Sequence, residues 1–404
     1  MKFFATILLF CSVFELIAQT KAKQTITENK VAAKTEAKIE VIPIIAPPSV
    51  PVKLPICFYK RIEGMVGKQK VIEMDLVKID SVIEGTYYYK NNVTPLELKG
   101  IVDAMGNITI SELGKYDIIN NKYPILATFK GLFYAEGLIK GTLTRIKNDS
   151  IYPFELKEFY QAGSGQFDLI RKQKVYSDCN NGGMCAKFTV IYPQMKKGAA
   201  VDKINKQIIA ALISHYTTRS SRKVTNLDGL IEDFIDRYKE EEKNFAQVDA
   251  TTKPSWTHYN EILVVFNAHH ILSLQFRTSI AESGEKPPVE LIEYENFDMN
   301  TGQLLKLEDI FIKDYKPKLA IIAEEIFRKQ YGFAANQPMK GFTFKNGFFE
   351  LNHNFTLNKK GIMFRYNPYE IAAYSTGATH IFIPFENIKN LINWNNVVGE
   401  LMKE

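Results

Sequence analysis

Short runs of β-favouring residues, separated by turn residues, dominate the chain from about residue 56 to residue 160. Gly, Asn and Asp interrupt these runs at roughly ten-residue intervals, which is typical of an antiparallel barrel or sandwich. The predicted strands are Val71–Val77, Gly85–Tyr89, Leu96–Leu98, Ile108–Ile110, Ile125–Phe129 and Leu138–Thr144. The pattern predicts an antiparallel β domain over residues 55–160.

From about residue 175 the pattern changes to alternating helices and strands. Apolar residues recur at helical spacing in Val201–Tyr216, Leu227–Phe245 and Lys316–Tyr331, and a last helix is expected over residues 385–402. The predicted strands are Ile262–Phe266, Ile271–Phe276, Leu291–Phe297, Phe348–Leu351 and Gly361–Tyr366. We therefore expect an α+β domain over residues 175–402, with helices packed on a mostly antiparallel sheet.

The N-terminus has the features of a secretory signal peptide. Lys2 precedes an almost wholly apolar run, Phe3–Phe14, and Ala18 is a small residue suited to the cleavage point. This run is shorter than the roughly 20 residues that a membrane-spanning helix needs, and no later stretch approaches that length. We expect residues 1–18 to be removed, no membrane span after cleavage, and an extracytoplasmic (periplasmic or secreted) location.

Residues 19–54 have the composition of a flexible linker. A run rich in Ala, Thr, Lys and Glu leads into five prolines between Pro43 and Pro55, and such a segment cannot form a packed core. Six lysines and three glutamates between Thr20 and Leu54 account for half of the net charge of +6. The remainder is close to balanced, which argues against nucleic acid as a partner.

Composition places the rest of the chain among globular proteins. Its 404 residues are 46% hydrophobic and 12% aromatic, which excludes a disordered or collagen-like protein and supplies at least two cores. The most acidic predicted element is the helix Leu227–Phe245, where seven acidic residues face three basic ones. Such a run is ordinarily a solvated face, although it would also suit a cationic partner.

Three cysteines remain after signal cleavage. Cys179 and Cys185 flank an Asn-Asn-Gly-Gly turn signal, and an oxidising compartment would permit a local disulfide between them. The alternative is a pair of reduced, partly buried thiols, with Cys57 unpaired in either case. No histidine lies near Cys179 or Cys185 in the sequence, so a zinc site is not expected there.

Signatures of catalysis are absent from the sequence. The chain contains no Gly-x-Ser-x-Gly elbow, phosphate-binding Gly-Lys loop, His-Glu-x-x-His pair or calcium-binding loop. On a strand, His269 and His270 would point to opposite faces, so they could not chelate one metal together. We expect no catalytic residue, no metal and no cofactor, and we favour a protein that is not an enzyme.

Two stretches of the second half resemble a known domain family. They are Leu304–Phe311, which follows the Asn300-Thr-Gly turn, and Phe364–Gly377, which runs into Ile381–Pro384. They resemble a bacterial extracytoplasmic domain family of unknown function, found in the lysozyme-binding part of anti-sigma-V factors and beside some peptidoglycan deacetylase domains. The resemblance covers about residues 175–402. It implies a partner-binding module, and it implies neither the deacetylase activity nor the signalling output.

The chain departs from that family in two respects. Members often carry a Gly-Gly-Ala-His turn where this sequence has Ser283–Pro288, so any role of that histidine is absent. The sequence also lacks the sigma-binding segment and membrane span of an anti-sigma factor, and it lacks the metal-binding residues of a deacetylase.

A loop within the resembling segment carries the densest cluster of aromatic and carboxylate side chains. Its members are Tyr366, Tyr369, Glu370 and Tyr374. Rigid amphipathic rings give contact area at low entropic cost, which suits recognition of a protein or a glycan. The alternative is that Asn367-Pro368 forms a turn and the tyrosines pin it to the sheet. We take the four residues as candidate ligand-binding residues.

Together these features predict a binding protein of the bacterial envelope. The candidate partners are the cell-wall glycan of peptidoglycan and a secreted protein such as lysozyme. The alternative is a peptidoglycan-modifying hydrolase with an unrecognised active site. A positively charged protein would repel a cationic lysozyme at long range, whereas anionic cell wall presents no such barrier.

Overall fold

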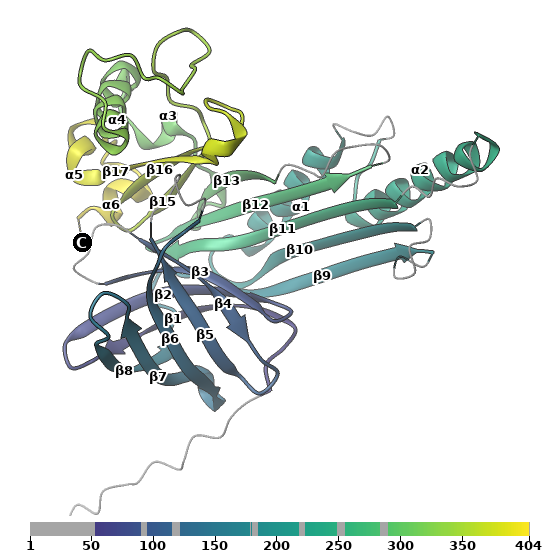
Figure 1. The fold of residues 1–404 in the computed structure, drawn as a ribbon, viewed down its shortest axis with the longest axis horizontal. Helices are drawn as coiled ribbons and strands as arrows, with labels where there is room; N and C mark the ends of the chain where they lie inside the picture. Colours follow the sequence, from purple (N-terminus) through teal and green to yellow (C-terminus); the bar gives the residue numbers. More distant parts are fainter. Residues whose placement is uncertain are drawn as a thin grey trace, which may run out of the picture. The chain divides into compact units, whose positions relative to one another are not determined.

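The N-terminal strands close into an antiparallel barrel (Figure 1). The computed structural model describes residues 53–89, 95–114, 122–177, 179, 185–217, 223–248, 255–282 and 290–403. The barrel strands are β1 (Cys57–Val66), β2 (Lys70–Ile79), β3 (Val82–Tyr89), β4 (Leu96–Val102), β5 (Asn107–Leu113), β6 (Ile125–Tyr134), β7 (Leu138–Arg145) and β8 (Ile151–Glu158). Each strand pairs with the next, and β1 pairs with β8 to complete the ring. The expected signal peptide and nearly all of the expected linker lie outside the described residues.

Alternation along the strands fills the barrel. On β2, Ile72, Met74 and Leu76 point into the barrel core. The intervening Glu73 and Asp75 point outward, yet both are buried, because the barrel packs against a second sheet at this face.

A six-stranded sheet follows the barrel. Its order is β14-β13-β12-β11-β10-β9, with β9 (Gln166–Tyr176), β10 (Cys185–Lys197), β11 (Ser255–Ala268), β12 (Ile271–Ala281), β13 (Leu291–Asp298) and β14 (Gln303–Leu304). Only β10 and β11 among these are parallel, because two helices, α1 (Val201–Thr217) and α2 (Leu227–Val248), form the crossover between them. Apolar side chains of both helices, including Ile208 and Phe234, pack on one face of the sheet around Phe188.

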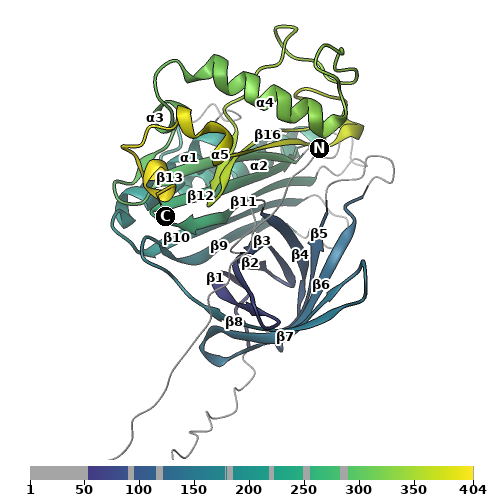
Figure 2. The same cartoon turned by 90° about the vertical axis from the view of Figure 1, so that its left-hand side faces the viewer.

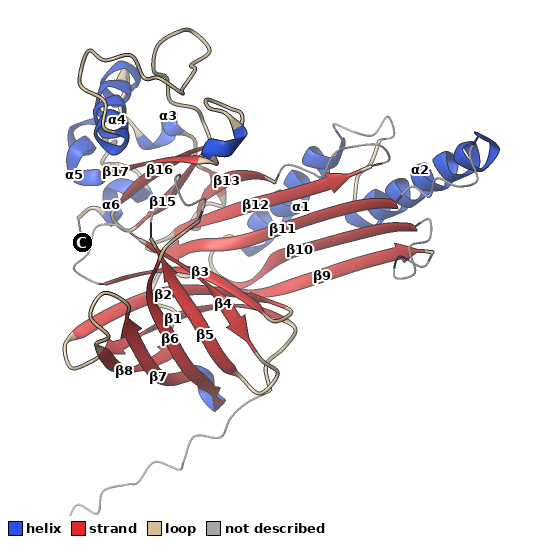
Figure 3. Ribbon diagram, viewed as in Figure 1, coloured by secondary structure: helices blue, strands red, loops and turns tan. Residues whose placement is uncertain are grey.

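A three-stranded sheet completes the fold. It consists of β15 (Phe355–Asn358), β16 (Gly361–Tyr366) and β17 (Thr379–Pro384) and carries α4 (Tyr315–Tyr331) across one face (Figures 1 and 2). Short helical turns flank it at α3 (Leu307–Ile310), α5 (Phe385–Ile388) and α6 (Val397–Leu401). Helices and strands are coloured separately in Figure 3, where strands clearly predominate. The expectation of an antiparallel β unit followed by an α+β arrangement is confirmed, and the β unit is a barrel.

Three local features differ from what the sequence suggested. The expected helix over 385–402 breaks after α5 and a 3-10 turn, because Asn396 caps a new helix by accepting a hydrogen bond from Gly399 N. The expected strand Phe348–Leu351 is a loop whose Phe349 packs into the core. His269 and His270 form the β11–β12 turn, both with positive φ, instead of lying on a strand.

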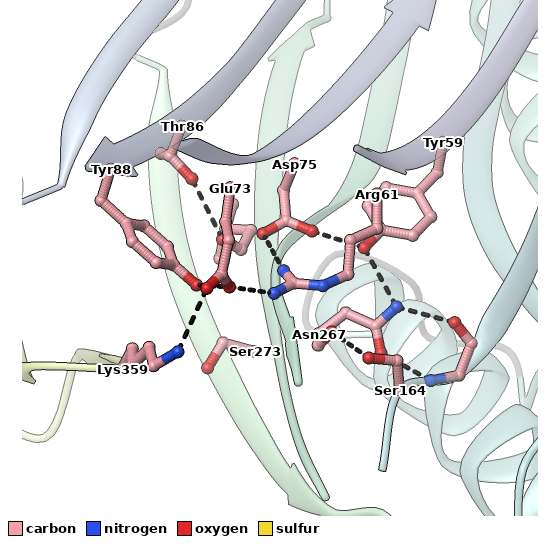
Figure 4. A network of polar contacts seen from close by, with 12 residues as sticks. Tyr59, Arg61, Glu73, Asp75, Thr86, Tyr88, Ser164, Asn267, Ser273 and Lys359 are labelled. Atoms are coloured by element: carbon pink, nitrogen blue, oxygen red, sulfur yellow. Dashed lines mark hydrogen bonds and ion pairs between the residues drawn. The ribbon is translucent and has the colours of Figure 1, made fainter. Parts of the chain in front are cut away.

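A buried polar network joins the barrel to the six-stranded sheet (Figure 4). The Arg61 guanidinium donates to Glu73 at 2.6 Å and to Asp75 at 3.0 Å, and all three side chains are at least 95% buried. Lys359, which follows β15, reaches Glu73 at 3.1 Å. Because the network draws on the barrel and on the β15–β16 turn, it fixes the barrel against both sheets.

A second branch of the network runs into β11. The Tyr59 hydroxyl donates to Asp75 at 2.6 Å, and Asn267 Nδ2 donates to Tyr59 at 3.0 Å. The same Asn267 amide exchanges two hydrogen bonds with the backbone of Gly165, both at 2.7 Å. Thr86 Oγ1 donates to the Val265 carbonyl at 3.3 Å on the other side. Each side chain named in this contact therefore has a polar partner, as burial requires.

Candidate functional site

An open cleft of about 480 Å³ lies between the barrel and the two sheets. Its volume is within the range of small-ligand sites. Strands β3 and β4 of the barrel form one wall, β11 to β13 form the floor, and β15 to β17 with the β16–β17 loop form the other wall. The charged side chains that line it are Glu84, Glu97, Lys99, Arg277, Glu290 and Arg365. The three acidic and three basic side chains that line the cleft balance one another in charge.

Arg277 on β12 is enclosed by carboxylates. It pairs with Glu84 at 2.9 Å, with Glu290 at 2.8 Å and with the buried Glu261. Lys99 gives Glu84 a second cation at 2.8 Å. Although burial opposes ionisation, Arg277 and Lys99 hold the pKa of Glu84 below its usual value. Within the cleft lining, the cations Arg277 and Lys99 are therefore neutralised by two carboxylates, those of Glu84 and Glu290.

Arg365 on β16 has a different environment. Its Nη1 donates to His380 Nε2 at 2.6 Å and its Nε donates to Asn367 at 3.2 Å, while the Tyr294 hydroxyl also interacts with it. Burial, and to a lesser degree the Arg365 charge, lowers the pKa of His380 to about 3, so His380 is neutral and accepts this bond. Neutral partners therefore orient Arg365 without cancelling its charge.

Glu97 on β4 lies on the opposite wall. Water reaches its side chain through the cleft, but protein surrounds it on both sides, and the resulting desolvation raises its pKa despite the opposing effect of Arg365. Among the described residues, neither Glu97 nor Arg365 forms a direct ion pair. The cleft therefore presents one anionic and one cationic group that the protein itself does not neutralise.

The four candidate residues predicted from the sequence divide into three roles. Tyr366 is 2% exposed and donates its hydroxyl to the Glu350 carbonyl, which makes it a core residue. Glu370 accepts hydrogen bonds from Asn367 N and from Asn352 Nδ2, both at 2.8 Å, and so pins the turn. Tyr369 and Tyr374 are 67% and 55% exposed, and their rings stack at 5.3 Å. Tyr374 also lines the cleft.

Two asparagines hold the wall that carries Arg365 against β13. Asn354 accepts from Tyr294 N and donates to the Ile292 carbonyl, at 2.9 and 2.8 Å. Asn367 accepts from Ile292 N and donates to the same carbonyl, both at 3.0 Å. These side-chain amides satisfy the β13 edge as a neighbouring strand would, which protects the edge and fixes the cleft geometry.

The described cysteines do not line the cleft. The Sγ atoms of Cys179 and Cys185 are bonded to each other, with 5.1 Å between their Cα atoms. Cys57 is a half-buried free thiol that donates to the Leu169 carbonyl. Within the described residues there is no group of three or more His, Cys, Asp or Glu side chains that could hold a metal ion. No helix of the described part is long and apolar enough to cross a membrane.

Comparisons with known proteins identify a family of unknown function. Residues 308–386 match the model of a family described as a protein of unknown function, DUF3298. No curated protein matches the chain. The matched segment includes Arg365, Tyr374 and His380 of the cleft, whereas the barrel wall with Glu97 lies outside it.

Solved structures of the same family align with the chain. A member of the DUF3298 family from Bacteroides fragilis NCTC 9343 has a TM-score of 0.49 and 22% identity, covering 61% of this chain and 100% of that one. A DUF3298 family protein from Pseudomonas aeruginosa PAO1 has a TM-score of 0.43 and 13% identity, covering 57% of this chain and 97% of that one. The match of residues 308–386 to the DUF3298 model confirms the expected resemblance to a domain family of unknown function.

Proposed function

We propose that this protein is an extracytoplasmic recognition module of the bacterial envelope, and that its ligand binds in the cleft between the barrel and the sheets. The observation that carries the proposal is the cleft itself: it is open, about 480 Å³ in volume, and lined by charged groups and Tyr374. The family similarity supports a binding role only through the resemblance described above, because the family itself has no assigned function.

The ligand we propose is a fragment of peptidoglycan. The stacked Tyr369–Tyr374 pair offers an exposed aromatic surface beside the cleft, and such rings pack against sugar faces while their hydroxyls reach water. Oriented polar groups inside the cleft, foremost Arg365, would fix the bound fragment. The disulfide is compatible with the extracytoplasmic location that this ligand requires.

The test is co-sedimentation of the protein with purified peptidoglycan sacculi across a salt series, with the supernatant analysed for released fragments. We expect binding that persists at moderate salt and no fragment release. Tyr374→Ala should weaken binding, whereas Phe348→Ala, which removes an exposed aromatic ring that does not line the cleft, should not. Release of fragments would instead establish the hydrolase alternative.

Absence of binding to sacculi would exclude the wall as ligand. Lysozyme, the protein partner that the resemblance implies, would then be mixed with this protein, and formation of a complex would be measured as faster sedimentation of the mixture. The exposed Asp236 and Glu240 of α2 are the acidic side chains that such a cationic partner would contact.

A further inference from the structure

The charges of the cleft divide into a satisfied set and an unsatisfied pair. Arg277, Lys99, Glu84 and Glu290 neutralise one another through direct ion pairs. Glu97 and Arg365 remain, on opposite walls of the cleft. Among the described residues neither forms a direct ion pair, although burial raises the pKa of Glu97 and the charge of Arg365 opposes this rise from across the cleft. A ligand therefore meets one carboxylate and one guanidinium that no described residue neutralises through a direct ion pair.

Arg365 is prepared for an anionic group before the ligand arrives. Its Nη1 and Nε are held by His380 and Asn367, and Asn367 is itself held by two hydrogen bonds to Ile292. Because these partners are uncharged, the guanidinium keeps its full attraction for a carboxylate. A positioned donor of this kind loses little side-chain entropy on binding.

Glu97 is prepared for a cationic group. Its carboxylate has lost part of its hydration to the cleft walls, and within the described part of the chain the cation that acts on it is Arg365 across the cleft. An ammonium group placed beside it would restore the lost stabilisation of the charged form. A neutral sugar would leave this carboxylate unpaired.

We propose that Glu97 and Arg365 together select a ligand that carries both an ammonium and a carboxylate, which in peptidoglycan is the stem peptide and not the glycan strand. This inference rests on the proposed function, because it assigns which part of the wall enters the cleft. Apolar lining residues such as Leu98, Ile292 and Met363 provide the packing surface for a peptide between the two charges.

The test compares three forms of the same sacculi by co-sedimentation. One is intact, one has its stem peptides removed by an amidase, and one has its free amines acetylated. We expect the wild-type protein to bind intact sacculi, to lose binding to the amidase-treated glycan, and to bind the acetylated form about tenfold more weakly. Glu97→Gln should bind intact sacculi about tenfold more weakly and should not distinguish them from the acetylated form.

The control is Glu155→Gln, which neutralises an exposed carboxylate of β8 that does not line the cleft. It should bind like the wild type. Equal binding to intact and amidase-treated sacculi would overturn the inference and leave the proposed function standing. Glu97→Gln with wild-type affinity would overturn it as well. Binding to none of the three forms would overturn the proposed function and this inference together.

Discussion

At the scale of single residues, the turn Asn367–Glu370 places an aromatic ring where glycine is favoured. Glu370 N donates to the Asn367 carbonyl at 3.1 Å, Pro368 occupies the second position, and Tyr369 at the third has a φ of 71°. A left-handed conformation costs a bulky residue about 1 kcal/mol. Because the ring is 67% exposed, it does not recover this cost by burial in the core. We interpret this strain as retained for ligand contact.

Tyr369→Gly should therefore separate binding from stability. We expect the free energy of unfolding to stay level or rise by about 1 kcal/mol, because glycine adopts positive φ without strain. Binding to sacculi should fall, because the stacked pair loses one ring. Tyr366→Phe should do the opposite, losing about 1 kcal/mol of stability with its hydrogen bond to Glu350 and leaving binding intact. Urea unfolding and co-sedimentation measure the two effects, and a large stability loss in Tyr369→Gly would contradict the interpretation.

The sequence located one lining residue of the candidate site and missed the others. Tyr374 lay in a visible cluster of aromatic residues, and it lines the cleft. Glu97, Arg365 and His380 gave no such signal, because each is a lone polar residue in an alternating strand and reads as a solvated position. Their meeting depends on how the barrel packs on the sheets, which local patterns do not encode.

At the scale of elements, close approach of β1 and β8 closes the barrel. A Cβ added at Gly64 would lie 2.2 Å from the Glu155 carbonyl oxygen and 2.7 Å from Leu156 Cα. Both are backbone atoms, which cannot move without disturbing the β1–β8 pairing. Glycine is thus required at this crossing point of the two strands.

Gly64→Ala should lower the free energy of unfolding by about 3 kcal/mol, because the new methyl group forces the two strands apart. Gly229→Ala is the matched control, because the position lies in the first turn of α2 and an added Cβ would have no neighbour closer than 3.4 Å. Alanine is the better helix former, so the free energy of unfolding should rise by about 0.5–1 kcal/mol. Urea unfolding followed by circular dichroism gives both values. An unchanged free energy of unfolding in Gly64→Ala would show that the two strands are not in close contact.

The raised pKa of Glu295 on β13 predicts that the stability of the fold depends on pH. Burial, with a contribution from Glu293, raises its pKa from 4.5 to about 7. The folded state then holds the proton more tightly than the unfolded state, so its stabilising contribution is complete below pH 4.5 and is lost as pH rises through 7. Between pH 5 and pH 8 the free energy of unfolding of the wild type, measured by urea unfolding, should fall by about 2–3 kcal/mol relative to that of Glu295→Gln. Glu293→Gln should abolish only a smaller part of this pH-dependent loss, because Glu293 is the lesser cause of the raised pKa. The same pH dependence of stability in wild type and Glu295→Gln would contradict the prediction.

Elements with strong periodicity were predictable, and those set by tertiary contacts were not. The helices α1 and α4 begin and end within one residue of the expected bounds, because their apolar stripes pack directly on a sheet. The expected helix over 385–402 has the same apolar content, but Ile392 instead forms a bridge with Phe311 and Asn396 starts a new helix. Apolar residues in Phe348–Leu351 likewise pack from a loop, and the strand forms at Phe355–Asn358.

At the scale of the whole molecule, the Arg61 network determines how the barrel sits on the sheets. Arg61, Glu73 and Asp75 occupy outward positions of barrel strands, which in sequence read as solvent-facing. The structure buries them against β11 and the β15–β16 turn. This packing positions the cleft walls, and the sequence could not have predicted it. The division into separate domains at residues 55–160 and 175–402 stays a prediction.

Arg61→Met should lower the free energy of unfolding by about 3–5 kcal/mol, because it leaves Asp75 buried without a cation and leaves Glu73 with Lys359 alone. Arg171→Met, which breaks the more exposed pair with Asp80, should cost at most about 1 kcal/mol. Thermal and urea unfolding provide the comparison. Equal effects of the two substitutions would mean that the network does not hold the barrel in place.

The most direct test of the cleft as a ligand site is calorimetric titration of a soluble disaccharide-tripeptide from peptidoglycan into the folded wild-type protein and into Arg365→Gln. We predict saturable binding at one site of the wild type and about tenfold weaker binding by the variant, with Arg365→Lys between them because it keeps the charge and loses the planar fork. No heat of binding to the wild type, or equal affinity for wild type and Arg365→Gln, would contradict the assignment of the cleft.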